Sequence, residues 1–165
     1  MGWSATAMKK LTACFLLACG LIGCSGDTKA PEEARHYDFL MENGTLEMKD
    51  GVRLAVTYYR PSAKAPGETF PVIMEMLPYR KDDFFALRDY EYGAYFAKRG
   101  YVVARVDVRG TGASEGSIPV SEYSEAEISD AEELIAQLSQ KSWSNGKVGM
   151  YGLSWHAITH KSPPR

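Results

Sequence analysis

Lys147-Val148-Gly149-Met150-Tyr151-Gly152-Leu153-Ser154-Trp155 is the stretch that decides the fold. A short strand-like run leads directly into Gly152-x-Ser154, the opening of a Gly-x-Ser-x-Gly turn. Such a turn lifts a serine above an α/β sheet, where its hydroxyl can act as a nucleophile. The closing glycine would stand at position 156, where this chain has a histidine. Ser154 is therefore a candidate nucleophile on an incomplete motif, and the alternative is a surface serine in an ordinary turn.

Upstream of this turn, the hydrophobic pattern alternates between strands and helices. The predicted strands cover 44–48, 52–59, 70–77, 101–107 and 148–151. The predicted helices cover 92–99 and 121–140. Lys49-Asp50-Gly51 joins the first two strands as a tight hairpin, and the apolar runs that follow are typical of strands buried on both faces. The order predicts an α/β fold in which an N-terminal β-hairpin precedes parallel strands with helices on both faces.

Length and charge narrow the functional classes. The chain has 165 residues, which suits one domain. Its net charge is −2 and its pI about 5.9, and it has no basic run. A nucleic-acid partner is therefore not expected.

The N-terminal segment has the pattern of an export signal. Met8-Lys9-Lys10 is a positive n-region, and 11–21 is an apolar h-region too short to span a membrane. Residues 1–23 are thus predicted to be a signal peptide. Leu21-Ile22-Gly23-Cys24 resembles a bacterial lipobox, so Cys24 is the predicted lipidation site, the alternative being a plain secretory signal with an incidental Cys24.

These features predict an exported lipoprotein. The protein would be held on the bacterial membrane, on its periplasmic or cell-surface side, by lipid on Cys24. The small, charged and proline-containing stretch 24–36 would be the lipid-anchored tether. All three cysteines lie within the first 24 residues. After processing only Cys24 would remain, so neither a disulfide framework nor a cysteine metal site is expected.

A second glycine-rich stretch follows the predicted strand 101–107. Asp107-Val108-Arg109-Gly110-Thr111-Gly112-Ala113-Ser114-Glu115-Gly116 could be mistaken for a phosphate-binding loop. It lacks the Lys-Ser/Thr pair of a P-loop, and its glycines depart from Gly-x-Gly-x-x-Gly spacing. Nucleotide binding by this loop is therefore not expected.

Four segments together resemble the CocE/NonD hydrolases, relatives of the Xaa-Pro dipeptidyl-peptidases. They are 48–61 (Met-Lys-Asp-Gly-Val-Arg-Leu through Tyr-Arg-Pro), Leu77-Pro78-Tyr79-Arg80-Lys81, the 107–116 loop and 143–155. Their order and spacing match the family over residues 40 to 155. The resemblance implies that 37–155 is the N-terminal part of an α/β-hydrolase domain, and that 107–116 is a structural loop near the site.

The same resemblance implies a function. It implies hydrolysis of small esters or amides by a serine nucleophile, without cofactor or metal. Matched by motif, Ser154 is the nucleophile, the Tyr79 hydroxyl is an oxyanion-hole donor, and the backbone N–H of Trp155 is the second donor. From the residues alone, a loop tyrosine that packs its ring is the favoured interpretation of Tyr79. Esterase and Xaa-Pro peptidase activity both stay open.

A catalytic base and acid are not evident after the serine. In this fold they follow the nucleophile, yet the residues beyond Ser154 include no Asp or Glu. His156, His160 and His36 are poorly placed to serve as the base. We expect 156–165 to be a divergent tail, as a frameshift would produce, in an incomplete hydrolase fold truncated before the triad Asp and His. The alternative function is a catalytically inactive lipoprotein fragment.

Overall fold

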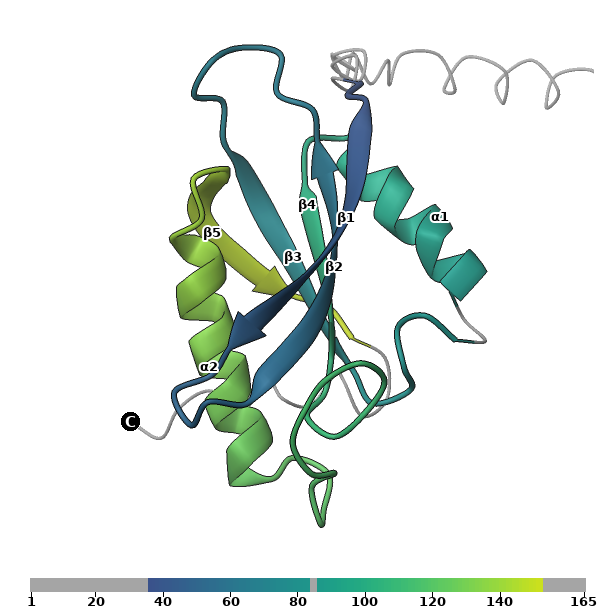
Figure 1. Cartoon of the computed structure of the whole chain (residues 1–165). Helices are drawn as coiled ribbons and strands as arrows, with labels where there is room; N and C mark the ends of the chain where they lie inside the picture. Colours follow the sequence, from purple (N-terminus) through teal and green to yellow (C-terminus); the bar gives the residue numbers. More distant parts are fainter. Residues whose placement is uncertain (1–35, 84–85, 153–165) are drawn as a thin grey trace, which may run out of the picture. The chain divides into compact units, whose positions relative to one another are not determined.

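The structure, a computed structural model, describes residues 36–83 and 86–152. In chain order its elements are β1 (Phe39–Glu47), β2 (Arg53–Pro61), β3 (Phe70–Leu77), α1 (Ala86–Ala97), β4 (Val102–Asp107), α2 (Glu125–Ser139) and β5 (Ser144–Met150). The five strands form one sheet in the order β1-β2-β4-β3-β5, with α1 on one face and α2 on the other (Figure 1).

The predicted hairpin is confirmed and is longer than expected. β1 and β2 pair antiparallel from Phe39↔Pro61 to Glu47↔Arg53. The turn closes through a hydrogen bond of 2.8 Å from the N–H of Gly51 to the carbonyl of Met48. β1 begins at Phe39 rather than at residue 44. The hydrophobic pattern missed the first half of this strand because that half is largely exposed and shows no apolar alternation.

The parallel part of the sheet is also confirmed. β4 is antiparallel to β2 but parallel to β3, and β5 pairs in parallel with the other side of β3. α1 connects β3 to β4, and α2 connects β4 to β5, which are the helical crossovers that parallel neighbours require. The sheet is therefore mixed, with the hairpin supplying its antiparallel edge.

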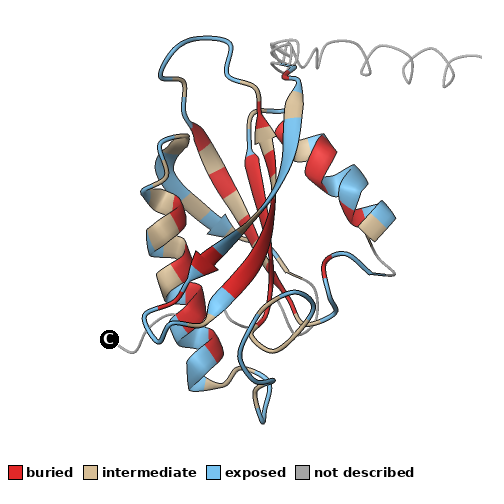
Figure 2. Ribbon diagram, viewed as in Figure 1, coloured by how far each residue is buried: buried red, intermediate tan, exposed pale blue. Residues whose placement is uncertain are grey.

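Each face of the sheet has its own apolar cluster. The larger cluster combines Ala131, Leu134 and Leu138 of α2 with alternate residues of β2, β3 and β4. The smaller cluster lies under α1 and is built on Tyr59, Ala97 and Val103. Figure 2 shows the buried residues concentrated on β2, β3 and β4, while β1 and β5 are mostly exposed. Neither helix in this part of the chain is long and apolar enough to cross a membrane.

Three other predicted boundaries, besides the start of β1, are wrong. α2 begins at Glu125 rather than 121, because the Ser124 side chain caps it and Glu127 bonds back in a capping box. β5 begins at Ser144 rather than 148, where the N–H of Phe70 on β3 already bonds to the carbonyl of Trp143. α1 begins at Ala86, six residues before the predicted start. Its first turn contains Asp89, whose contacts are described with the candidate site.

Tyr58 makes the stability of this core sensitive to high pH. Its ring packs edge-on against Trp143, with centroids 5.6 Å apart, and burial raises its pKa to about 12. An unfolded tyrosine titrates near pH 10, so the stabilisation is complete below about pH 10 and is lost as pH rises toward 12. Tyr58→Phe should therefore lose less stability than wild type between pH 9 and pH 11, measured by urea unfolding.

Tyr95→Phe is the matched control for this prediction, because the Tyr95 side chain is exposed on α1. It should keep the pH dependence of the wild-type protein. Equal losses in the wild type and in Tyr58→Phe would show that the Tyr58 phenol does not contribute.

Candidate active site

The candidate site lies at the carboxyl edge of the parallel strands. β3 ends at Leu77, β4 at Asp107 and β5 at Met150, and all three run in the same direction. The N–H of Tyr151 still bonds to the carbonyl of Met74, at 2.9 Å, so β5 stays beside β3 up to the start of the Gly152-x-Ser154 turn. Catalytic groups of open α/β sheets gather at this edge.

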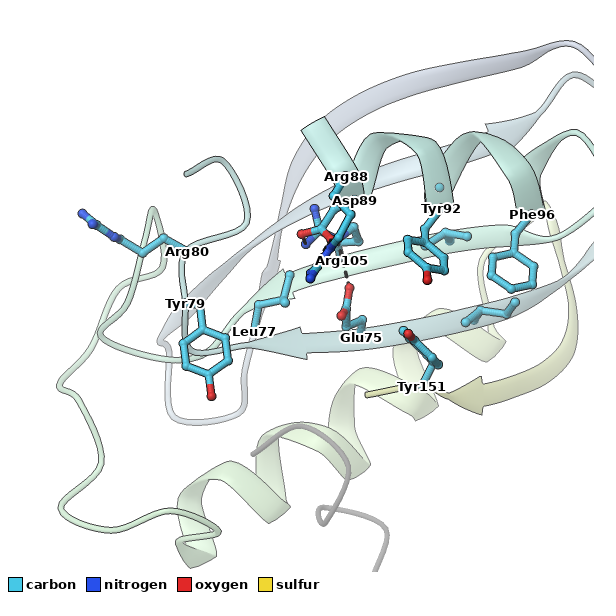
Figure 3. Close-up of a pocket in the computed structure, with 13 residues that line it drawn as sticks. Glu75, Leu77, Tyr79, Arg80, Arg88, Asp89, Tyr92, Phe96, Arg105 and Tyr151 are labelled. Carbon is cyan, nitrogen blue, oxygen red and sulfur yellow. Dashed lines mark hydrogen bonds and ion pairs between the residues drawn. The ribbon is translucent and has the colours of Figure 1, made fainter. Parts of the chain in front are cut away.

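Tyr79 lies at this edge, in the turn directly after β3, as the sequence predicted. Its side chain is 47% exposed, and Figure 3 shows its ring directed away from α1. The next residue, Arg80, has a φ of 65°, an unusual conformation for a residue other than glycine. The oxyanion-hole role of Tyr79 stays a prediction, because its predicted partners Ser154 and Trp155 lie outside the described residues. So do Cys24 and its predicted lipid.

Next to this turn lies a buried charge cluster that the sequence analysis missed. The guanidinium of Arg105 on β4 binds the Glu75 carboxylate at 3.0 Å and the Asp89 carboxylate at 2.6 Å. The same guanidinium donates to the backbone carbonyl of Lys81, at 3.3 Å. Arg105 is only 3% exposed, so these contacts replace its water. Figure 3 shows the cluster between α1 and the sheet.

The cluster accounts for the early start of α1. Asp89 belongs to the first turn of that helix, and its buried carboxylate is bound there by Arg105 and by the neighbouring Arg88. Glu75 and Arg105 are direct neighbours across β3 and β4. Burial raises the pKa of Glu75, and the Arg105 guanidinium opposes that rise. One charged residue in the middle of each of two apolar strands was the available sequence signal for this pair.

The 107–116 loop is structural, as expected. The N–H of Gly110 bonds to the carbonyl of Glu115 at 2.8 Å, and the N–H of Ala113 bonds to the Asp107 carboxylate at 3.0 Å. Arg109 pairs with the buried Asp130 carboxylate of α2. The N–H groups of Gly110 and Ala113 are thus hydrogen-bonded within the protein and are not available to a phosphate.

A cavity of about 190 Å³ lies between α1 and the strands. Tyrosines and the charge cluster line it, including Tyr79, Tyr92, Tyr151, Glu75, Asp89 and Arg105 (Figure 3). Within residues 36–83 and 86–152, no three His, Cys, Asp or Glu side chains gather where they could hold a metal ion. The side chains that line the cavity offer phenol hydroxyls, carboxylates and guanidinium groups.

Comparison with known proteins decides the family. The model of the X-Pro dipeptidyl-peptidase (S15) family matches residues 50–162, a span that includes Tyr79, the 107–116 loop and Ser154. The chain belongs to this S15 family. The match starts in the β1–β2 turn and runs past the described residues.

Two proteins similar to this chain are named as an esterase and a hydrolase. Cocaine esterase from Rhodococcus sp. is 39% identical over 118 residues, which are 71% of this chain and 20% of the esterase. A CocE/NonD family hydrolase from Staphylococcus aureus matches in structure with a TM-score of 0.61 at 31% identity, over 73% of this chain and 24% of that chain. The chain thus spans about a fifth of the length of the curated relatives it matches.

More distant structures share the fold. An α-amino acid ester hydrolase superposes with a TM-score of 0.60 at 24% identity, covering 84% of this chain and 25% of that chain. The predicted α/β-hydrolase type of fold is therefore confirmed, and the chain contains part of it.

Proposed function

We propose that this chain carries the nucleophile and oxyanion side of a serine acyl hydrolase of the CocE/NonD type. Ser154 would attack an ester or amide carbonyl, give its hydroxyl proton to a general base outside the residues assigned here, and displace the alcohol or amine. Water would then release the acyl group from the serine. The Tyr79 hydroxyl and the Trp155 backbone N–H would donate to the developing oxyanion. No cofactor or metal is needed for this acyl transfer.

One observation carries the proposal. The turn that holds Tyr79 follows β3, and β5, which leads into Gly152-x-Ser154, is the parallel neighbour of β3. Residues that follow adjacent parallel strands meet at one sheet edge, which is where a nucleophile and its oxyanion donor must lie together. Membership of the S15 family supports the same chemistry.

The substrate class proposed is a small ester or amide. The relatives are named as an esterase and an ester hydrolase, and the family as an X-Pro dipeptidyl-peptidase, so both acyl types occur among similar proteins. A phenol hydroxyl and a backbone N–H stabilise the tetrahedral oxyanion from either one. Esters have the better leaving group, so we expect ester hydrolysis to be the easier activity to detect.

Ser154→Ala is the decisive variant. The purified chain should react with a fluorophosphonate probe and hydrolyse p-nitrophenyl acetate, and both reactions should fall to background in the variant because the nucleophilic oxygen is gone. Peptide mapping of the labelled chain should place the probe on Ser154. Ser129→Ala, which changes an exposed serine on α2, should label like wild type.

A folded wild-type chain without label or ester hydrolysis would contradict the proposal. That result would favour the alternative, a catalytically inactive lipoprotein fragment. Label on a serine other than Ser154 would equally contradict the assigned nucleophile.

A further inference from the structure

The turn that holds Tyr79 is in a conformation that needs support. Arg80, directly after Tyr79, lies in the left-handed region with a φ of 65°. Side chains other than glycine are strained there and persist only where the surroundings fix them. The turn is stabilised locally by a bond of 3.1 Å from the N–H of Asp83 to the carbonyl of Arg80. An ion pair between the Arg80 and Asp83 side chains adds to this bond, and further supports come from β4.

Two buried side chains of β4 hold the backbone of Lys81 from both sides. The N–H of Lys81 donates to Oδ1 of Asp107 at 2.6 Å, and its carbonyl accepts from Arg105 at 3.3 Å. Arg105 and Asp107 are two residues apart on one strand, so they share a face of the sheet. They are 3% and 1% exposed, so water does not compete for these bonds.

The Asp107 carboxylate is itself fixed from its other side. Oδ2 of Asp107 accepts the N–H of Ala113 at 3.0 Å. The Ser114 hydroxyl donates to the backbone carbonyl of Asp107 at 2.7 Å, and the N–H of Ala55 on β2 donates to that hydroxyl at 2.8 Å. Asp107 thus joins the Tyr79 turn to the 107–116 loop and, through Ser114, to the hairpin.

We propose that Asp107 is a positioning residue for Tyr79. Its carboxylate holds the N–H of Lys81, and the left-handed turn at Arg80 then fixes where the Tyr79 phenol lies over the sheet edge. Arg105 assists by holding the Lys81 carbonyl. The inference rests on the proposed function, in which that phenol donates to the oxyanion, and Asp107 acts only through Tyr79.

A purely structural role for Asp107 would give a different result. It would lower stability throughout the 107–116 loop but leave the turn after β3 in place. Ser114→Ala models that case, because it removes the hydroxyl bonded to Asp107 and Ala55 and leaves both Lys81 bonds intact.

The test follows the turn by NMR in the full chain. In Asp107→Ala, amide hydrogen exchange of Lys81 should be about 10- to 100-fold faster, as expected for losing a bond to a charged acceptor. The NMR signals of the Tyr79 ring are assigned by comparison with Tyr79→Phe. In Asp107→Ala, the chemical shifts of these signals should change. In Ser114→Ala, Lys81 exchange and the Tyr79 signal should stay as in wild type.

The reaction provides a second readout. If the proposed function holds, Asp107→Ala and Tyr79→Phe should each slow fluorophosphonate labelling, by up to about 10²-fold, and the double variant should be no slower than Tyr79→Phe. A wild-type chain that is not labelled would refute the proposed function, while exchange and the ring signal would still decide the role of Asp107.

Two outcomes would overturn the positioning role. One is a folded Asp107→Ala variant with unchanged Lys81 exchange or an unmoved Tyr79 signal. The second outcome concerns Asp107→Asn, which is used if Asp107→Ala does not fold. The asparagine side chain offers one acceptor oxygen to the two N–H groups of Lys81 and Ala113. Unchanged protection of both Lys81 and Ala113 in that variant would contradict the proposal.

Discussion

Arg105→Met is expected to destabilise the protein by about 3–5 kcal/mol, because it removes the buried cation that the Glu75 and Asp89 carboxylates share. Arg88 also binds Asp89, but its side chain is exposed, so it compensates only in part. The Asp89 and Glu75 side chains are 8% and 13% exposed and both bind this guanidinium. The methionine approximates the length of the side chain, so the loss reports charge and hydrogen bonds more than volume. Urea unfolding at neutral pH measures it through the transition midpoint.

Arg60→Met is the matched control. Arg60 binds Glu42 at 2.8 Å, but those side chains are 28% and 45% exposed. Exposed pairs contribute about 0–1 kcal/mol, so this variant should stay close to wild type. Similar losses in the two arginine variants would show that burial of the Arg105 cluster does not control its contribution.

Gly112→Ala should be the other severe substitution, with a loss of about 2–5 kcal/mol. Gly112 has a φ of 52°, and a Cβ there would collide with the Asp107 carboxylate. That carboxylate cannot swing away without giving up the N–H groups of Lys81 and Ala113. Backbone strain and steric overlap therefore add.

Gly51→Ala separates these two effects. Gly51 has a φ of 84°, but a Cβ there would meet nothing within 4 Å. Only the strain of the left-handed conformation remains, about 1–2 kcal/mol. If Gly112→Ala unfolded at the same urea concentration as Gly51→Ala, the close approach to Asp107 would have no energetic weight.

Local patterns predicted the parts of the fold that depend on neighbours in sequence. Lys49-Asp50-Gly51 indicated the hairpin turn because a tight turn needs few residues and one glycine. The apolar runs of β3 and β4 indicated buried parallel strands because both of their faces are covered by helices. The position of Tyr79 after β3 followed from the end of that run.

The missed features depend on contacts between distant residues. The predicted helix began only at Tyr92, yet Asp89 belongs to α1, where Arg105 of β4 binds its buried carboxylate together with Arg88. The role of Asp107 was likewise hidden, because its partner N–H groups come from two different loops. Sequence spacing alone does not bring those groups together.

The pairing of β5 has a consequence for how the protein folds. β1 and β2 pair through a short turn, whereas β5 pairs with β3 across α1, β4 and α2, as in Val72↔Val148. Closing so long a loop costs more chain entropy, so the hairpin should form early and β5 should dock late. The segment that leads into Ser154 would then be completed last, and a partly folded chain would lack its candidate nucleophile site.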